Sequence, residues 1–239
     1  MALPTNNFSS EIARIEQTYA RRGSHVPSDR YSSFNPGTLF LTQEVERHLL
    51  AGLSERGYSG LQGARILDIG CGTGFWLRNF VNWGARPENL FGLDLLAERV
   101  EQARQSLPAS ASVAQGSATE VAFADRSFDL VFQFTVFSSI LQTEMRQQVA
   151  REMLRVLKPS GYVVWYDFYL NNPKNKDVRG VSKKEIRTLF PGCICSFHRI
   201  TLAAPLSRAL GRRLSFLYHT LATTKILSTH YLAFIQKQA

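Results

Sequence analysis

The sequence predicts an α/β fold, in which a mostly parallel sheet of seven strands carries helices on both faces. Short apolar runs alternate with amphipathic segments between residues 65 and 167. This order is typical of parallel strands joined by crossover helices. A glycine-rich turn directly follows the first apolar run. The expected strands are 65–69, 89–94, 112–116, 128–134, 162–167, 193–202 and 229–236.

Helical spacing of apolar residues places helices between these strands and before the first of them. Gly84 and Pro108 are expected to end two of the helices, and Pro159-Ser160-Gly161 a third. Ser182, with Glu185 three residues later, has the pattern of a capping box and predicts a helix start. The expected helices are 8–22, 38–56, 73–83, 96–107, 143–158, 181–190 and 205–221.

In the glycine-rich turn, residues 65–75, an apolar run ends in Asp68, and Gly70, Gly72 and Gly74 follow at every second position. Glycine lets a ligand approach the main chain closely, and the following helix start offers unpaired N–H groups. The spacing D-x-G-x-G-x-G differs from the dinucleotide pattern G-x-G-x-x-G. Asp68 would repel a pyrophosphate but could accept a hydrogen bond from an ammonium. A ligand with a nucleoside at one end and an amino acid at the other fits better.

This turn resembles motif I of the class I S-adenosylmethionine (SAM) dependent methyltransferases. The runs FADRSFDLVFQF and EMLRVLKPSGYVVWYDF are also similar to that family, and the resemblance covers about residues 60–170. The overall pattern is similar to small-molecule methyltransferases of the quinone-biosynthesis type. The resemblance implies a Rossmann-like fold whose last strand is antiparallel, SAM as the cofactor, and methyl transfer as the reaction.

The residues that would bind the cofactor are sought at the carboxyl ends of the strands, where open parallel sheets bind their ligands. Asp94 is well placed for two ribose hydroxyls, and Leu95 for packing on adenine. The family usually has an aspartate where this chain has Ser117, a weaker acceptor for the adenine amino group. By resemblance, the end of the fourth strand, Gln133-Phe134-Thr135, lies beside the methionine part of SAM. The predicted cofactor-binding residues are Asp68, Gly70, Cys71, Gly72, Asp94, Leu95, Ser117, Ala118 and Gln133.

Candidate catalytic residues follow from the reaction. The sulfonium methyl group is already activated, so the protein mainly positions the acceptor and removes a proton where one must leave. Asp167 ends the fifth strand and His25 lies in the polar stretch 23–37, so both are predicted as bases. Tyr31, in the same stretch, and Tyr166 are predicted to hydrogen-bond the acceptor or the cofactor. The alternatives are that Asp167 caps the next turn and that His25 is an exposed loop residue.

The chain is expected to divide into two parts. Residues 1–57 are predicted to form an N-terminal helical lid, and residues 58–239 the SAM-binding domain. The segment 205–228 lies between the last two strands, where folds of this kind often carry a substrate cap. Its leucine stripe is expected to pack against the core or to form the cap.

The net charge of +9 is unevenly distributed. Residues 1–169 carry 16 Lys and Arg against 17 Asp and Glu, whereas residues 170–239 carry 12 against 2. Arg208, Arg212 and Arg213 accompany the leucine stripe, and Lys174 lies upstream. Such asymmetry indicates an anionic partner such as a phosphate, a lipid head group or a nucleic acid. The alternative is a solvated basic face that keeps the protein soluble.

The remaining composition is that of a cytoplasmic protein. No apolar run is long enough to span a bilayer, and the N-terminus does not have the pattern of a signal peptide. The three cysteines show no metal-binding spacing and suit a reducing compartment. No metal is implied.

These observations predict a SAM-dependent methyltransferase acting on a small-molecule or carrier- or lipid-linked metabolite, with oxygen as the expected methylated atom. A phosphate-bearing acceptor and peripheral membrane contact are both compatible with the basic last third. The absence of an Asn/Asp-Pro-Pro-aromatic run after the fourth strand argues against nucleic-acid base methylation. The alternatives left open are an RNA methyltransferase using the basic last third and a SAM-binding relative that does not methylate. An NAD-dependent dehydrogenase is a more distant alternative.

Overall fold

All seven strands belong to one sheet, in the order β3-β2-β1-β4-β5-β7-β6. The computed structural model describes residues 8–25, 32–172, 175–211 and 215–238. Strands β1 to β5 run parallel, and β7 is antiparallel to both of its neighbours, which confirms the predicted sheet. The strands are β1 (Ile66–Ile69), β2 (Leu90–Asp94), β3 (Ser112–Gln115), β4 (Phe128–Phe134), β5 (Leu157–Phe168), β6 (Cys193–Leu202) and β7 (Ser228–Lys237).

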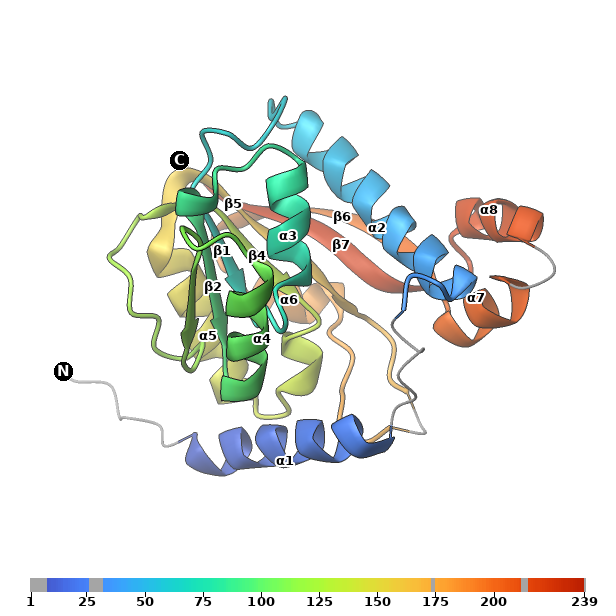
Figure 1. Cartoon of the computed structure of the whole chain (residues 1–239), viewed down its shortest axis with the longest axis horizontal. Helices are drawn as coiled ribbons and strands as arrows, with labels where there is room; N and C mark the ends of the chain where they lie inside the picture. Colours follow the sequence, from blue (N-terminus) through green and yellow to red (C-terminus); the bar gives the residue numbers. More distant parts are fainter. Residues whose placement is uncertain (1–7, 26–31, 173–174, 212–214, 239) are drawn as a thin grey trace.

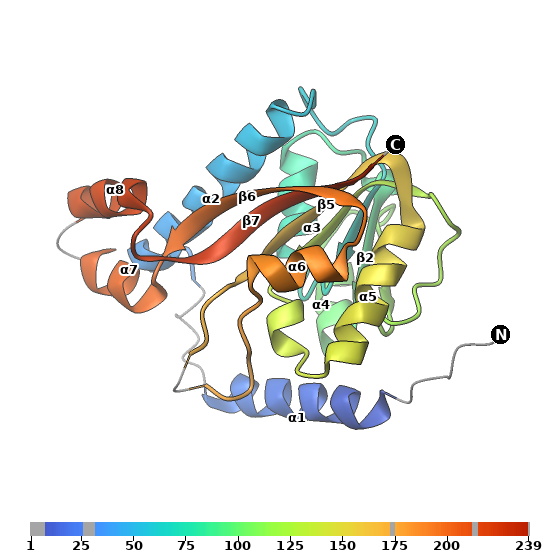
Figure 2. The ribbon, with the colours of Figure 1, turned by 180° about the vertical axis from the view of Figure 1, so that it is seen from behind.

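Two helical layers cover the sheet (Figures 1 and 2). On one face lie α2 (Pro36–Ser54), α3 (Phe75–Asn82) and α4 (Ala97–Ser106), which share a buried apolar cluster with the sheet. On the other lie α5 (Thr143–Val156) and α6 (Lys183–Leu189). β1 is buried along its whole length, as expected of a strand covered on both faces.

The helix α1 (Ser9–His25) lies across the carboxyl ends of the central strands rather than on either face of the sheet (Figure 1). Ile15 is 8% exposed and belongs to the same apolar cluster as α5. The next helix, α2, begins at the N-cap residue Asn35, whose side chain accepts from the Gly37 backbone N–H at 3.1 Å.

The predicted boundary between the fourth crossover helix and the fifth strand was wrong. We expected the helix to continue to Lys158, but α5 ends at Val156 and β5 already begins at Leu157. The pairing with β4 shifts between Phe128 and Leu130, so residues 158–161 form a bulge within β5. Lys158 Nζ stabilises this bulge by contacting both carboxylate oxygens of Asp129 at 2.8 Å.

The prediction of one continuous helix over residues 205–221 was also wrong. The structure describes α7 (Ala204–Gly211) and α8 (Ser215–Thr224), which lie side by side at one end of the sheet (Figure 1). Both contact the α2 region: Ser207 Oγ donates to the Gly37 carbonyl at 2.7 Å and Tyr218 Oη to Glu44 at 2.6 Å. A leucine period gives the same signal for one helix as for two consecutive ones, so the sequence pattern missed the break.

The start of α6 agrees with the predicted capping box. Ser182 is the N-cap, and its hydroxyl accepts from the Glu185 backbone N–H at 3.2 Å. The Glu185 carboxylate, however, reaches toward α5 instead of back to the cap.

Candidate active site

The turn after β1 brings two segments into close contact. Gly70, Gly72 and Gly74 all have left-handed backbone angles, with φ of +71°, +55° and +77°. A Cβ atom at Gly70 would lie 2.4 Å from Val136 Cγ2, in the segment after β4. The backbone N–H groups of Gly70 and Cys71 donate to the Leu93 carbonyl of β2, at 2.7 and 3.1 Å. The turn is therefore held between the ends of β2 and β4.

Asp68 is a buried carboxylate without a hydrogen-bond partner. Its side chain is 1% exposed, and neither oxygen contacts a donor among the described residues. The pKa of this carboxyl group is raised well above its usual value, mainly by burial and to a smaller extent by the nearby Asp94. Buried polar groups are normally hydrogen-bonded, so Asp68 fits a site that binds an ammonium or another donor. The contact of Asp68 with the amino-acid end of SAM stays a prediction.

Asp94, at the end of β2, faces the same turn from the opposite side. One of its carboxylate oxygens accepts from the Gly72 N–H at 2.8 Å, and the other from the Leu96 N–H at 3.0 Å. A carboxylate has about four acceptor positions, so these two bonds orient the group and leave acceptor positions for hydroxyl donors. The geometry fits the pair of ribose hydroxyls that the sequence suggested.

A cavity of about 140 Å³ lies at the carboxyl edge of the sheet. Five of the predicted cofactor-binding residues line it: Gly70, Asp94, Leu95, Ser117 and Ala118. The other four, Asp68, Cys71, Gly72 and Gln133, are not among its lining residues. Phe134 and Thr135, at the strand end expected beside the methionine part of SAM, also line it, whereas sequence reasoning missed the lining residues Ile15, Tyr19, Arg99, Val136, Ser139, Ile140 and Met145.

Ser117 makes only local contacts. Its hydroxyl lies 2.8 Å from Thr119 Oγ1 and accepts from the Thr119 backbone N–H at 3.3 Å. The side chain thus forms a small turn at the cavity wall. That Ser117 contacts adenine stays a prediction.

Gln133 is fully buried and shapes the turn after β4. Its Oε1 accepts from the Val136 N–H at 3.0 Å, and its Nε2 donates to the Tyr166 carbonyl at 3.4 Å. Within this turn Thr135 has a φ of +59°, which is uncommon for a branched residue. Such backbone strain concentrates at functional sites, and Thr135 is one of the cavity-lining residues.

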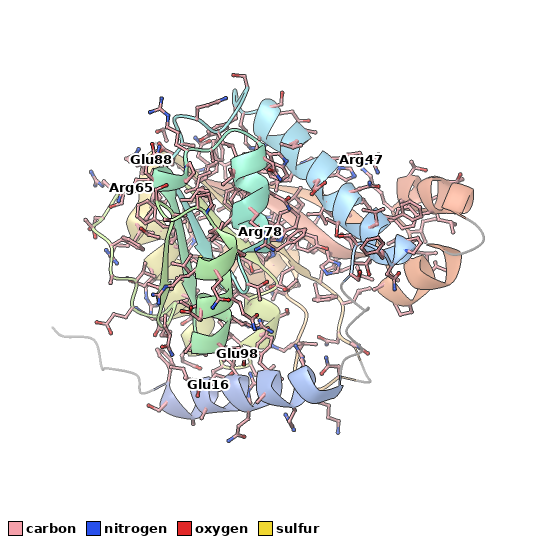
Figure 3. The ribbon with its side chains drawn as sticks, in the orientation of Figure 1. Glu16, Arg47, Arg65, Arg78, Glu88 and Glu98 are labelled. Carbon is pink, nitrogen blue, oxygen red and sulfur yellow. The ribbon has the colours of Figure 1, made fainter. Side chains whose placement is uncertain are left out.

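The helix α1 covers the cavity from outside. Tyr19 Oη lies 3.1 Å from Ser139 Oγ, and the Arg99 guanidinium lies 4.3 Å from the Tyr19 ring centroid. Figure 3 shows the neighbouring Glu98, in the first turn of α4, close to α1. These contacts join α1, α4 and the segment after β4 around the same opening.

A second set of contacts attaches α1 to the segment after β4. Glu11 is 4% exposed, and its carboxylate accepts from the backbone N–H groups of Leu141 and Gln142. Arg14 bonds to Glu11 and donates to the Ser139 carbonyl at 2.6 Å. Burial opposes ionisation of Glu11, but the bonds to Arg14 and Leu141 outweigh it, and the pKa is lowered from its usual value.

Asp167 is fully buried at the end of β5 and is not among the residues lining the cavity. Its two oxygens accept from the backbone N–H groups of Ser138, at 3.0 Å, and Phe168, at 2.8 Å. Burial raises the pKa of its carboxyl group to about 6. In this position it fixes the segment after β4, while its role as a base stays a prediction.

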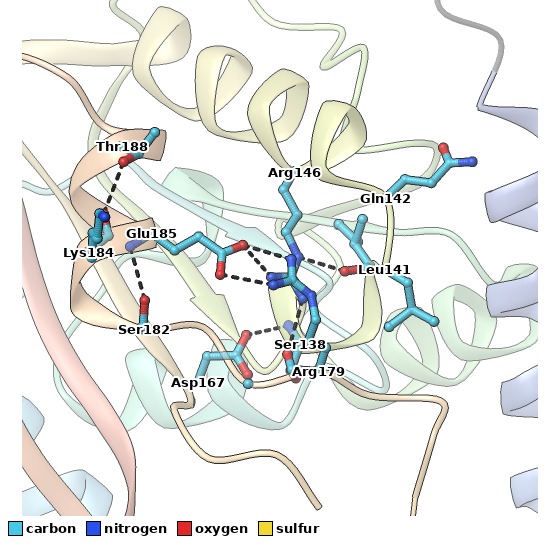
Figure 4. A network of polar contacts seen from close by, with 12 residues as sticks. Ser138, Leu141, Gln142, Arg146, Asp167, Arg179, Ser182, Lys184, Glu185 and Thr188 are labelled. Carbon is cyan, nitrogen blue, oxygen red and sulfur yellow. Dashed lines mark hydrogen bonds and ion pairs between the residues drawn. The ribbon is translucent and has the colours of Figure 1, made fainter.

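A network beside Asp167 fixes the same segment (Figure 4). The buried Arg146 donates to the Ile140 carbonyl at 2.6 Å, to Glu185 at 2.6 Å and to the Arg179 carbonyl at 3.1 Å. This arginine links α5, α6 and the loop before α6. Charge-assisted bonds of this kind are strong when buried.

Several predicted residues lie outside the described structure. Tyr31 falls outside the described residues, as do Lys174, Arg212 and Arg213. His25 ends α1 and Arg208 lies in α7, but the structure describes neither side chain. Their predicted roles stay predictions. Tyr166 is predicted to hydrogen-bond the acceptor or the cofactor. In the structure its hydroxyl lies 2.8 Å from Thr201 Oγ1.

Comparison with known proteins points to one family. Residues 66–161 match a family model described as a methyltransferase domain. The ubiquinone/menaquinone biosynthesis C-methyltransferase of Geotalea daltonii is 33% identical over 109 residues, which cover 44% of this chain and 45% of the relative. An O-methyltransferase of Aspergillus nomiae is 25% identical over 171 residues, covering 70% of each chain. The chain spans less than half the length of most of the curated relatives it matches.

Solved structures share the fold. A phosphoethanolamine N-methyltransferase of Haemonchus contortus, in complex with phosphoethanolamine and S-adenosylhomocysteine, superposes with a TM-score of 0.66 at 13% identity. The alignment covers 97% of this chain and 50% of that one. At this identity the likeness concerns the fold.

The family model covers the glycine turn, Asp94 and strands β1 to β4, and the sheet order matches the fold of the structural relatives. The match over residues 66–161, together with the sheet order, thus assigns this part of the chain to the class I SAM-dependent methyltransferases.

Proposed function

We propose that this protein transfers the methyl group of SAM to a small-molecule or carrier- or lipid-linked acceptor, with oxygen as the receiving atom. The observation that carries the proposal is Asp68, a buried carboxylate with two unpartnered oxygens beneath the glycine turn. With Asp94 and the adjoining cavity, it suits the amino-acid and ribose ends of one ligand. When bound, SAM supplies a sulfonium methyl group that a nearby nucleophile can take up.

The acceptor is proposed to enter beside α1. The cavity walls contributed by Ile15, Val136, Ile140 and Met145 are apolar, which favours a compact acceptor with apolar surface. The residues 1–57 are proposed to act as the lid, with α1 as the part that touches the cavity. The segment with α7 and α8 is proposed as the substrate cap at the far end of the carboxyl edge.

Proton removal from a hydroxyl acceptor is assigned to Asp167 or His25 in this proposal, with Tyr31 orienting the acceptor. A carboxyl group with a pKa of about 6 is suited to accept a proton near neutral pH. Asp167 would have to act after a movement of the segment that contains Ser138, because its oxygens face that backbone.

The experiment is a screen for S-adenosylhomocysteine release. Purified protein is incubated with SAM and separate pools of phenols, carboxylic acids, amines, isoprenoid-linked phenols, phosphate-bearing acceptors and short RNAs. Release with an oxygen-bearing small or lipid-linked acceptor, absent in Asp94→Ala, is expected. Release with RNA alone would refute the proposed acceptor class. SAM binding by calorimetry without release in any pool would instead favour a relative that binds SAM and does not methylate.

A further inference from the structure

The outward side of α6 and the adjoining edge strand β6 carry a cluster of four cations. Lys183, Lys184 and Arg187 come from α6 and Arg199 from β6, and all but the half-buried Lys183 are exposed. In the described part of the chain, none of them is ion-paired with a carboxylate. We refer to these four residues as the basic surface. It accounts for part of the positive charge of the last third of the sequence.

The one acidic residue of α6 points away from this surface (Figure 4). Glu185 reaches inward and contacts Arg146 Nη1 at 2.6 Å and Arg179 Nη2 at 2.8 Å. In the same view Lys184 extends to the opposite side of the helix. Because its carboxylate is engaged on the inner side, Glu185 does not neutralise the outer one.

Aromatic rings on the sheet hold the cations in place. Lys183 Nζ lies 5.3 Å from both the Phe197 and the Tyr231 ring centroids. The guanidinium groups behave likewise: Arg187 lies 5.3 Å from Phe197, and Arg199 lies 5.7 Å from Tyr169. Contacts of this geometry are cation–π interactions. They fix the cations in position and also occupy faces of the rings.

Exposed apolar side chains lie in the turn before β7, which Tyr169 links to Arg199 of the basic surface. Ile226 is 80% exposed and Leu227 is 41% exposed, directly before β7. Tyr169, which lies under Arg199, donates its hydroxyl to the Ser228 carbonyl and its backbone N–H to the Thr229 carbonyl. The turn is thereby attached to the same row of aromatic rings. Leu170, next to Tyr169, is 52% exposed.

We propose that the basic surface binds a lipid bilayer that contains anionic lipids, with Leu170, Ile226 and Leu227 inserting at the headgroup level. Cations beside exposed apolar side chains provide both terms of interfacial binding, attraction to anionic headgroups and burial of apolar area. This would place the carboxyl edge of the sheet, where the cavity opens, near the membrane. The proposal does not depend on the methyl acceptor.

Two other anionic partners fit the geometry less well. A small phosphate ligand requires a concave site, and in the described part of the chain none of the four cations lines the cavity at the carboxyl edge. A single-stranded nucleic acid requires free aromatic faces for base stacking, but Phe197, Tyr231 and Tyr169 already contact cations. Exposed aliphatic side chains contribute to bilayer binding and have no counterpart in nucleic-acid binding.

The test is co-sedimentation of the full chain with phosphatidylcholine–phosphatidylserine vesicles and with phosphatidylcholine vesicles alone. Binding is expected only to the first. The triple variant K183Q/K184Q/R187Q should bind about a hundredfold more weakly, at about fivefold per cation. Ile226→Ser should weaken binding about tenfold. S-adenosylhomocysteine affinity and melting temperature are measured on every variant to show that the fold and the cofactor site are intact.

The charge-matched control is R86Q/R126Q/R151Q, which removes three exposed arginines elsewhere on the protein, and Leu50→Ser is the control for Ile226→Ser. Both should retain vesicle binding within about twofold of the starting protein. Equal loss in the two triple variants would overturn the proposal, because net charge alone would then explain binding. So would a K183Q/K184Q/R187Q variant that keeps vesicle binding and loses binding to single-stranded RNA.

Discussion

Tyr19 on α1 and Ser139 after β4 lie 3.1 Å apart, oxygen to oxygen, at the wall of the cavity. The two residues are 120 positions apart in the chain. Their contact joins the proposed lid to the segment after β4, which lines the cavity. Removing it tests whether α1 controls exchange of the cofactor.

Tyr19→Phe should accelerate release of S-adenosylhomocysteine about fivefold. The substitution removes one neutral hydrogen bond, worth about 1 kcal/mol, while the ring that lies under Arg99 remains. Stopped-flow displacement of the bound product measures the rate. Tyr162→Phe, on the sheet away from the cavity, is the matched control and should leave the release rate unchanged. Equal rates for both variants would contradict a gating role for α1.

Asp68→Asn should weaken SAM binding and raise the stability of the free protein. The folded-state pKa of this carboxyl group is raised, so its contribution favours the fold at low pH and is lost as the pH rises above its unfolded value. Removing the ionisable group abolishes this loss at neutral pH. Each kcal/mol regained should raise the melting temperature by about 2–4 °C. A lower melting temperature together with unchanged SAM affinity in calorimetry would refute this account of Asp68.

Ser117→Asp should strengthen S-adenosylhomocysteine binding about tenfold or more. A carboxylate is a stronger acceptor for an amino donor than a hydroxyl, and hydrogen bonds to charged groups are worth about 1.5–3 kcal/mol. Calorimetry measures the affinity, with S-inosylhomocysteine as the matched ligand that lacks the amino group. If Asp strengthens the binding of both ligands equally, Ser117 does not face the adenine amino group.

Asp167→Asn should destabilise the protein and weaken cofactor binding together. Asp167 accepts from two backbone N–H groups, and an amide has one oxygen, so one donor is left poorly paired at a cost of about 1–3 kcal/mol. Thermal unfolding and calorimetry measure the two effects. A variant with normal stability and normal cofactor affinity that fails only in turnover would instead favour the role of Asp167 as a base.

The sequence predicted the frame of the fold because the frame depends on local patterns. Buried strands such as β1, terminal signals such as Ser182, and the glycine spacing after Asp68 are all set by neighbouring residues. At Lys158 the predicted helix ran two residues too far, and the strand that begins at Leu157 is attached to β4 through the contact of Lys158 with Asp129. Such long-range contacts leave no periodic signal in the sequence.

The same distinction explains the candidate site. Asp94, Ser117 and Ala118 could be found because they follow strands directly. Tyr19 and Ile15 come from a helix whose position over the sheet depends on Glu11 and its contacts with the segment after β4. Arg99 lies on α4, whose sequence indicates an amphipathic helix but not which of its residues reach the cavity. For Gln133, the place beside the methionine part of SAM stays a prediction, and the sequence did not reveal its backbone partners, Val136 and Tyr166.

The close approach of Gly70 to Val136 limits which substitutions the site can accept. The glycine turn and the segment after β4 share one contact surface, so neither can be reshaped alone. A larger side chain at position 136 would displace the glycine turn, and any residue but glycine at position 70 would displace the loop. New acceptor specificity should therefore arise in α1 and in the segment with α7 and α8, which can vary without touching this contact.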